Sequence, residues 1–222
     1  MSYASFSDFD RPSPALLERA REFQPAILCD VAGRRGTMHA RIRALAPAMK
    51  LCGPAFTVEV RPGDNLMLHV ALAIARPGDV LVVDGKADQT CALFGELMAT
   101  QAIAAGLGGL VVDAAVRDLD VLARAPFPVF CAGANPCGPT KGLPGKLSIP
   151  VAVGGVSVSP GDLVTGDADG VVVIPRADVE TVLDAAEKKV AAEDRRVREI
   201  AAGVLISPWL DDALRQAGLP AL

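Results

Sequence analysis

The stretch that decides the fold is residues 79–118, DVLVVDGKADQTCALFGELMATQAIAAGLGGLVVDAAVRD. Its composition predicts an apolar strand, an amphipathic helix and a second apolar strand, at Val80–Val83, Ala92–Ala105 and Leu110–Val112. Gly106 is the expected helix stop. Because a helix-length connection separates two buried strands, we expect a parallel, right-handed βαβ unit.

Two polar motifs fall at the same edge of this predicted unit. Gly95-Glu96-Leu97-Met98 lies near the helix start, and Arg117-Asp118 follows the second strand. Ligands of open α/β sheets bind outside the carboxyl ends of the strands, where a helix start also favours anions. Arg117 offers a planar fork for a carboxylate, and Asp118 offers oxygen to a divalent cation. By spacing alone, a solvated turn at Arg117-Asp118 is an equally good interpretation.

The motif GELM, a twenty-residue gap after Glu96, and then Arg117-Asp118 resemble the signature of the class II 4-hydroxy-4-methyl-2-oxoglutarate aldolase family. Relatives of that family include the regulators of ribonuclease E activity, the RraA-like proteins. The resemblance runs from about Cys29 to Pro175. It includes further blocks at 30–33 (DVAG), 53–58 (GPAFTV), 62–65 (PGDN), 77–84 (PGDVLVVD), 154–163 and 169–175.

The resemblance implies a swivelling β/β/α-type α/β fold for a single domain, residues 1–222, with a core at about 25–175. A mixed, partly parallel sheet is expected, because the closing strands look antiparallel. Outside the central unit the patterns predict strands at 55–60, 128–132, 163–165 and 171–174, a strand bent at glycines over 150–159, and helices at 14–23, 65–75 and 176–202. A tail at 206–222 holds the one Trp, Trp209, and has no assignment.

The resemblance also implies chemistry: cleavage of a 4-hydroxy-2-oxo acid to pyruvate, and decarboxylation of oxaloacetate through the same enolate. Asp118 would hold a divalent metal cation, Mg²⁺ or Mn²⁺, which acts as the electron sink. Arg117 and Glu96 are the expected catalytic residues. The expected substrate-binding groups are Gly95, Glu96, the backbone N–H groups of Leu97 and Met98, Arg117 and Asn65.

The late helix is strongly charged after an apolar stripe at its start, so its second half suits reaching over a neighbouring subunit. In the family such a helix supplies a carboxylate to the metal across the interface. Glu193 is the best positional candidate and Glu199 the second, and a solvated helix face is the alternative. The resemblance implies a homotrimer or a hexamer with sites between subunits.

Composition limits the remaining classes. A net charge of −4 and a pI of about 5.2 argue against a nucleic-acid surface, which needs clustered Lys and Arg. The five cysteines show no CxxC spacing, which is typical of a reduced cytoplasmic protein. Apolar runs are too short to span a bilayer, so we expect no membrane partner. Most of the arginines at 34, 35, 41 and 43 are expected at the surface.

Three alternatives stay open. The first is a non-catalytic regulator of ribonuclease E; those relatives lack the acidic residue after the Arg, so Asp118 favours the enzyme. The second is a Schiff-base lyase using Lys86 or Lys141, although no apolar run surrounds either lysine. The third is an enzyme of this fold with another acid as substrate, because the loop at 134–147 departs from the family pattern. His69 is expected to be a packing or surface residue.

Overall fold

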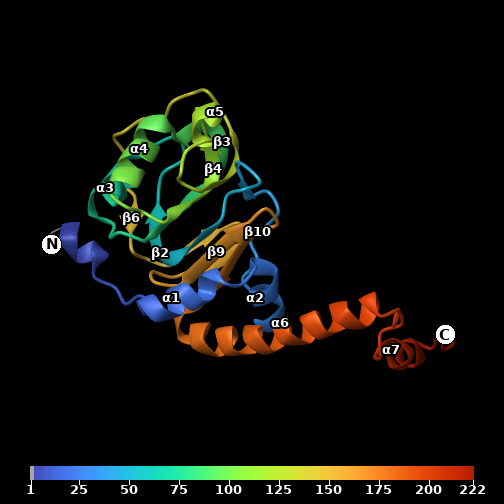
Figure 1. Ribbon diagram of the computed structural model, residues 1–222. Helices are drawn as coiled ribbons and strands as arrows, with labels where there is room; N and C mark the ends of the chain where they lie inside the picture. The colour runs from blue at the N-terminus through green and yellow to red at the C-terminus, as the bar shows by residue number, and fades with distance from the viewer. Residues whose placement is uncertain (1–2) are drawn as a thin grey trace.

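The computed structural model describes residues 3–222, which form a single α/β domain with a long C-terminal helix (Figure 1). One sheet has the strand order β1-β5-β4-β3-β2-β9-β10, and β6 pairs with β2. The strands of this sheet are β1 (Arg43–Ala44), β2 (Leu51–Glu59), β3 (Val80–Phe94), β4 (Gly109–Val116), β5 (Val129–Ala134), β6 (Lys146–Leu147), β9 (Leu163–Asp167) and β10 (Gly170–Ile174). Pairing is parallel from β2 to β5 and antiparallel elsewhere, which confirms the predicted mixed sheet.

The central βαβ unit is confirmed, because β3 pairs with β4 in parallel and α4 (Glu96–Ala104) connects them. The predicted helix start at Ala92 is wrong. Residues up to Phe94 continue β3, and the pairing of Phe94 with Val116 keeps the chain extended there. β3 is longer than β4, so the excess bulges outward after Val83, where Lys86 and Ala87 take positive φ angles.

Helices cover the sheet in two groups (Figure 1). α3 (Leu66–Ile74), α4 and the short α5 (Leu119–Leu122) lie with the parallel strands, where one core cluster includes Phe56, Leu68 and Leu110. α1 (Pro14–Arg21), α2 (Pro25–Val31) and the first part of α6 (Val179–Ala201) pack around β9 and β10 in a separate cluster. The side with α3, α4 and α5 carries the carboxyl ends of β3 and β4.

The prediction of one bent strand at 150–159 is wrong. β7 (Val151–Val153) and β8 (Val156–Val158) form an antiparallel hairpin, with Gly154 and Gly155 at its turn. Their φ angles of 57° and 80° are those of a two-residue hairpin turn that glycine adopts without steric cost. The second predicted hairpin, β9 with β10, is confirmed, and Asp167 and Asp169 lie at its turn.

One of the arginines expected at the surface is instead structural. Arg41 makes a bidentate pair with Asp113, with Nε at 2.9 Å and Nη2 at 2.6 Å from the carboxylate oxygens. Asp113 is buried in β4 and also accepts the N–H of Gly154 at 3.0 Å. The pair therefore ties the loop before β1 and the β7-β8 hairpin to the central sheet.

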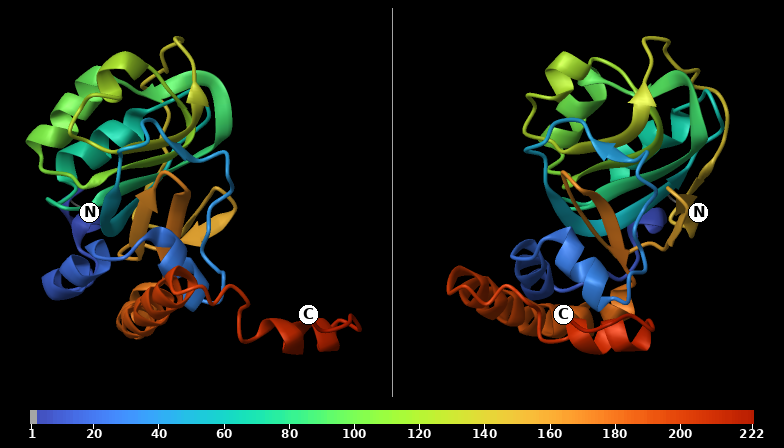
Figure 2. Two further views of the ribbon diagram at one scale, coloured as in Figure 1. Left: turned by 45° about the vertical axis from the view of Figure 1, so that its right-hand side comes forward. Right: turned by 90° about the vertical axis from the view of Figure 1, so that its right-hand side faces the viewer.

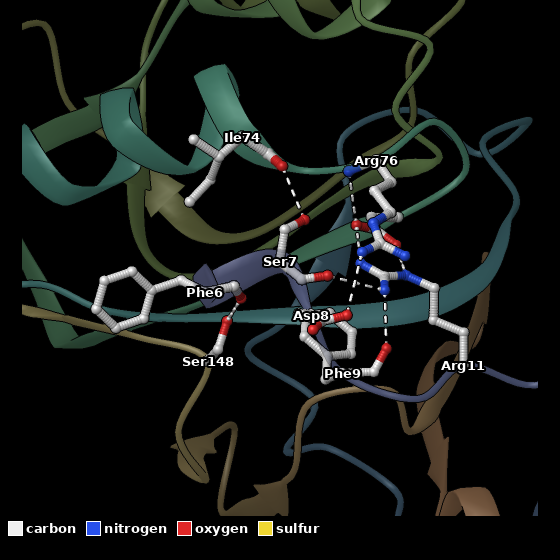
Figure 3. A network of polar contacts seen from close by, with 9 residues as sticks. Phe6, Ser7, Asp8, Phe9, Arg11, Ile74, Arg76 and Ser148 are labelled. Atoms are coloured by element: carbon white, nitrogen blue, oxygen red, sulfur yellow. Dashed lines mark hydrogen bonds and ion pairs between the residues drawn. The ribbon is translucent and has the colours of Figure 1, made fainter. Parts of the chain in front are cut away.

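The N-terminal segment is docked against α3 and the start of β3 (Figure 3). Ser7, in the 3-10 helix Tyr3–Ser7, donates its hydroxyl to the carbonyl of Ile74 at 2.8 Å. Arg11 pairs with the fully buried carboxylate of Asp79 at 2.7 Å and lies 3.9 Å from the ring centroid of Phe9. Ser7 and Arg11 thus anchor the described part of the N-terminal segment to α3 and to the residue before β3.

The C-terminal helix leaves the body of the domain (Figure 2). After the 3-10 turn Arg176–Asp178, α6 buries Val179, Leu183 and Ala186, and its second half runs past the domain to α7 (Leu210–Gln216). None of the helices in residues 3–222 combines the length and the apolar character needed to cross a membrane.

Candidate active site

Arg117 and Asp118 form a strained turn at the end of β4. Asp118 has φ 61° and ψ 41°, a left-handed conformation that is uncommon for a residue other than glycine. This turn directs its Oδ2 toward the start of α4, where it accepts the backbone N–H of Glu96 at 2.9 Å. The two sequence motifs are therefore in direct contact. Strain of this kind is typical of functional sites.

Gly95 makes this contact possible through its lack of a side chain. A Cβ built on Gly95 would stand 2.5 Å from Asp118 Oδ2 and 3.1 Å from Cγ of Arg117. Its φ of −160° is ordinary extended backbone, so the requirement at this position is for space. The glycine of GELM is thus the residue that lets the Arg-Asp turn pack on the helix start.

Backbone donors at the start of α4 are partly used. Met98 donates its N–H to the carbonyl of Gly95 at 3.1 Å, and Glu96 donates to Asp118. Within the described chain the N–H of Leu97 has no partner, and it lies at the end of a helix where anions are favoured. Of the two backbone groups predicted to bind a carboxylate, Leu97 is the one left free.

Asn65 lies at the start of α3, against the same segment. Its Nδ2 donates to the carbonyl of Leu93 at 2.8 Å and contacts the sulfur of Met98 at 3.4 Å. Its Oδ1 is buried without a hydrogen-bond partner in residues 3–222, and so is Nε2 of His69 one turn later. Buried polar atoms without partners are uncommon, and both residues line the cleft described next.

A cleft of about 320 Å³ joins these groups. It is lined by Asn65, His69, Ala92, Leu93, Phe94, Gly95, Glu96, Leu97, Met98, Arg117, Asp118, Pro139 and Lys141. Except for Glu193, every residue predicted for the site lines it. His69 and Lys141 do so as well, although the first was expected to be packing and the second only a rival nucleophile. Both residues are far in sequence from the GELM and Arg117-Asp118 motifs, so no local sequence pattern predicted that they would join the site.

The electrostatics of the cleft leave its charged groups available. Arg117 is half-exposed, and its Nε lies 3.7 Å from Asp118 Oδ2. Glu96 is exposed beside it on the first turn of α4. Burial, with a smaller contribution from Lys141, lowers the pKa of His69, so this imidazole is neutral at pH 7.

The two candidate carboxylates of α6, Glu193 and Glu199, do not line the cleft. Glu193 pairs with Lys189 at 2.9 Å, and Lys189 also pairs with Asp30 of α2. Glu199 pairs with Arg196 at 3.1 Å. Both acids are on the projecting α6, on the side of the domain away from α4 (Figure 1). Either carboxylate would reach a cleft only as part of another copy.

The donor set fits a hydrated divalent cation. Oδ1 of Asp118 has no hydrogen-bond partner in the described residues, and Glu96 lines the same cleft. No three His, Cys, Asp or Glu side chains of residues 3–222 are grouped as a complete metal cage. Mg²⁺ commonly uses one or two carboxylates and keeps several waters, so the available oxygens match that cation.

The alternative nucleophile Lys86 is placed outside the cleft. Its ammonium lies 2.6 Å from Asp84 and 3.1 Å from Glu59. The hydrogen bond to Asp84 raises the pKa of Lys86 despite partial burial, which keeps the amine protonated and unreactive. A Schiff base at Lys86 is therefore disfavoured.

Sequence comparison establishes the family. A family model described as RraA-like, Aldolase/RraA, matches residues 25–173, so the chain belongs to the RraA-like family. A relative from Halalkalibacterium halodurans is 42% identical over 164 residues, 74% of this chain and 78% of the relative. Its name is "Putative 4-hydroxy-4-methyl-2-oxoglutarate aldolase". A relative from Aromatoleum aromaticum with the same name is 33% identical over 159 residues, 68% of this chain and 96% of that protein.

Solved structures confirm the fold. Streptomyces coelicolor RraAS2, described as an unusual member of the RNase ES inhibitor RraA protein family, superposes with a TM-score of 0.77 and 29% identity. The match covers 85% of this chain and 98% of that one. The RNA-processing inhibitor RraA from Thermus thermophilis matches with a TM-score of 0.64 and 28% identity, covering 69% of this chain and 93% of that one.

Proposed function

We propose that this protein is a divalent-metal-dependent pyruvate aldolase that cleaves 4-hydroxy-4-methyl-2-oxoglutarate or a related 4-hydroxy-2-oxo acid. We infer that it also decarboxylates oxaloacetate. The single observation that carries the proposal is the packing of the Asp118 carboxylate on the start of α4, beside the half-exposed Arg117 guanidinium. The names of the aldolase relatives support the same reaction class.

Both reactions break a carbon–carbon bond and leave its electron pair on a pyruvyl fragment. In the aldol cleavage the C4 hydroxyl loses its proton, the C3–C4 bond breaks, and the pyruvate enolate takes a proton at C3. In decarboxylation the same enolate forms as CO₂ leaves. One site that stabilises negative charge on the 2-oxo oxygen therefore serves both reactions.

The residues of the cleft divide these tasks. Arg117, which lines the cleft, would stabilise the developing oxyanion, an effect typically worth ~10²–10³ in rate. The N–H of Leu97 would bind the carboxylate next to the 2-oxo group. Glu96 would hold or move the proton exchanged with the substrate. Asp118, with Glu96, would hold Mg²⁺ or Mn²⁺, which when bound supplies a Lewis acid to the 2-oxo acid.

Asp118 also distinguishes this proposal from the non-catalytic alternative. A regulator that acts by protein contact needs no strained Asp directed at a helix start. The solved structures include a member of the RNase ES inhibitor RraA protein family and an RNA-processing inhibitor RraA, so the alternative to test is inhibition of a ribonuclease. A regulator would bind a ribonuclease and leave 2-oxo acids unchanged.

The proposal is tested by measuring pyruvate release from oxaloacetate with Mg²⁺, with EDTA, and with Mg²⁺ restored after EDTA. A parallel series without protein corrects for spontaneous decarboxylation. Activity above that background, lost with EDTA and recovered with Mg²⁺, is the expected result. Folded protein without activity in any condition would overturn the proposal. Covalent attachment of pyruvate to the protein on treatment with borohydride would instead favour a Schiff base at Lys141.

By resemblance to the family, we propose a homotrimer or hexamer in which Glu193 of one copy completes the site of another. The second half of α6, which projects beyond the body of the domain, is consistent with a contact to a neighbouring copy (Figure 2). A monomer by light scattering, at a concentration where the protein is active, would overturn the shared site. We also propose a cytoplasmic location with no nucleic-acid partner.

A further inference from the structure

Pro139 and Lys141, in the loop at 134–147, form part of the wall of the cleft. Asn65, His69 and the start of α4 line the same cleft. In residues 3–222 the ammonium of Lys141 has neither a hydrogen bond nor an ion pair. An unpaired cation on the wall of a cleft is a candidate binding group for an anion.

A buried carboxylate fixes the loop. Asp64 is 1% exposed, and its Oδ2 accepts the Thr140 hydroxyl at 2.7 Å, the Gly142 N–H at 2.7 Å and the Leu143 N–H at 3.1 Å. Its Oδ1 accepts the N–H of Leu66 at 2.9 Å, on the first turn of α3. The one carboxylate thus joins α3 to the two residues on either side of Lys141.

Backbone pairing reinforces the same junction. Thr140 donates its N–H to the carbonyl of Gly63 at 2.8 Å and accepts the N–H of Asn65 at 3.0 Å. The loop has no regular secondary structure of its own between Thr140 and Gly145. Its conformation therefore depends on contacts with 63–66, the segment that also positions Asn65 in the cleft.

Asp64 stays ionised in this position. Burial alone would raise its pKa, but the hydrogen bonds from Gly142, Leu66, Thr140 and Leu143 outweigh burial and lower the pKa to about 2. A charged acceptor makes stronger hydrogen bonds than a neutral one. The loop is accordingly held over the whole range of pH in which the protein would work.

We propose that Asp64 is a positioning residue that holds Lys141 over the cleft, and that Lys141 selects 2-oxo acids carrying a second carboxylate. The pyruvyl end would lie at Arg117, Asp118 and Leu97, and the distal carboxylate would meet the ammonium of Lys141. The inference rests on the proposed function for the reaction that the site performs. The expected selectivity for dicarboxylates rests on the position of Lys141 in the cleft.

The test compares two substrates in wild type and Lys141→Met. The dicarboxylate is 4-hydroxy-4-methyl-2-oxoglutarate, and the monocarboxylate is 4-hydroxy-2-oxopentanoate. Loss of one charge-assisted contact is expected to raise KM for the dicarboxylate on the order of 10-fold and to leave KM for the monocarboxylate within about 2-fold. Lys146→Met is the matched control, because Lys146 belongs to the same loop region but pairs with Glu59 outside the cleft.

Asp64→Asn tests the positioning role. An amide keeps the size of the side chain but meets the N–H groups of Gly142 and Leu143 with a donor in place of an acceptor. We expect it to reproduce the selective rise in KM, and to add little when combined with Lys141→Met, because both changes remove one interaction. Thr140→Val, which removes the contacts of this hydroxyl with Asp64 and with the carbonyl of Gly63, serves as the milder variant if Asp64→Asn does not fold.

A binding assay separates this inference from the proposed function. Calorimetric titration with Mg²⁺ and either 2-oxoglutarate or 2-oxobutanoate needs no turnover. A preference for 2-oxoglutarate that disappears in Lys141→Met supports the inference even if no substrate is cleaved. An unchanged ratio of the two substrates or ligands in Lys141→Met, or additive effects of Asp64→Asn and Lys141→Met, overturns it while leaving the aldolase proposal standing.

Discussion

Replacing Gly95 with alanine tests the contact between the two motifs. The new Cβ would stand 2.5 Å from Asp118 Oδ2, whereas contacts under 3.0 Å force something to move. The carboxylate must therefore retreat by at least about 0.5 Å, and the guanidinium stem of Arg117, 3.1 Å away, must shift with it. Because Gly95 has an ordinary extended φ, alanine adds no backbone strain and the core stays unaltered.

Displacing a reacting group by about 1 Å can cost 10²-fold in rate. We expect Gly95→Ala to lower kcat/KM for oxaloacetate decarboxylation by roughly 10- to 100-fold on that scale. The assay couples pyruvate release to NADH oxidation by lactate dehydrogenase, with thermal unfolding measured in parallel. Lys146→Met is the control, because Lys146 pairs with Glu59 outside the cleft. If Gly95→Ala keeps kcat/KM within about 3-fold of wild type, the position of the Asp118 carboxylate does not govern catalysis.

Three further predictions concern the site and the fold. Asp118→Asn, which tolerates the left-handed backbone, should keep the melting temperature but reduce Mg²⁺-dependent turnover to background; retained turnover would remove Asp118 from the site. Arg11→Met strands the buried Asp79 carboxylate and should lower stability by about 3 kcal/mol in urea unfolding, while the exposed Arg21→Met should change it by less than about 1 kcal/mol. For Asp64 the folded pKa of about 2 lies below the usual 3.8, so its contribution is present above about pH 4 and is lost as pH falls toward 2. Urea unfolding between pH 3 and 7 should show a shallower decline below pH 4 for Asp64→Asn than for wild type.

The parts of the fold that depend on local pattern were predictable from the sequence. Val80–Val83 and Leu110–Val112 are short apolar runs with a helix-length gap, and they become parallel neighbours. Because Glu96 and Arg117-Asp118 follow adjacent strand ends, topology alone brought the two motifs together. Ser13 caps α1 as its position before Pro14 indicates, accepting the N–H of Leu16.

The errors arise where tertiary contacts override local pattern. Residues 92–94 are compatible with a helix, but pairing of Phe94 with β4 keeps them extended until Gly95. Arg41 resembles its surface neighbours in sequence, and only the fold brings the buried Asp113 within 2.6 Å. Lys141 enters the cleft because Asp64, far away in the chain, binds its loop. Long-range pairs of this kind leave no periodicity to detect.

The most direct test of the central claim follows the methyl protons of pyruvate in D₂O by NMR. Formation of the pyruvate enolate is common to both proposed reactions and requires no knowledge of the second substrate. The account predicts protein-dependent exchange of these protons with Mg²⁺, abolished by EDTA and by Asp118→Asn. Folded protein that leaves the methyl protons unexchanged with Mg²⁺ or Mn²⁺ would contradict an enolate site at Arg117 and Asp118.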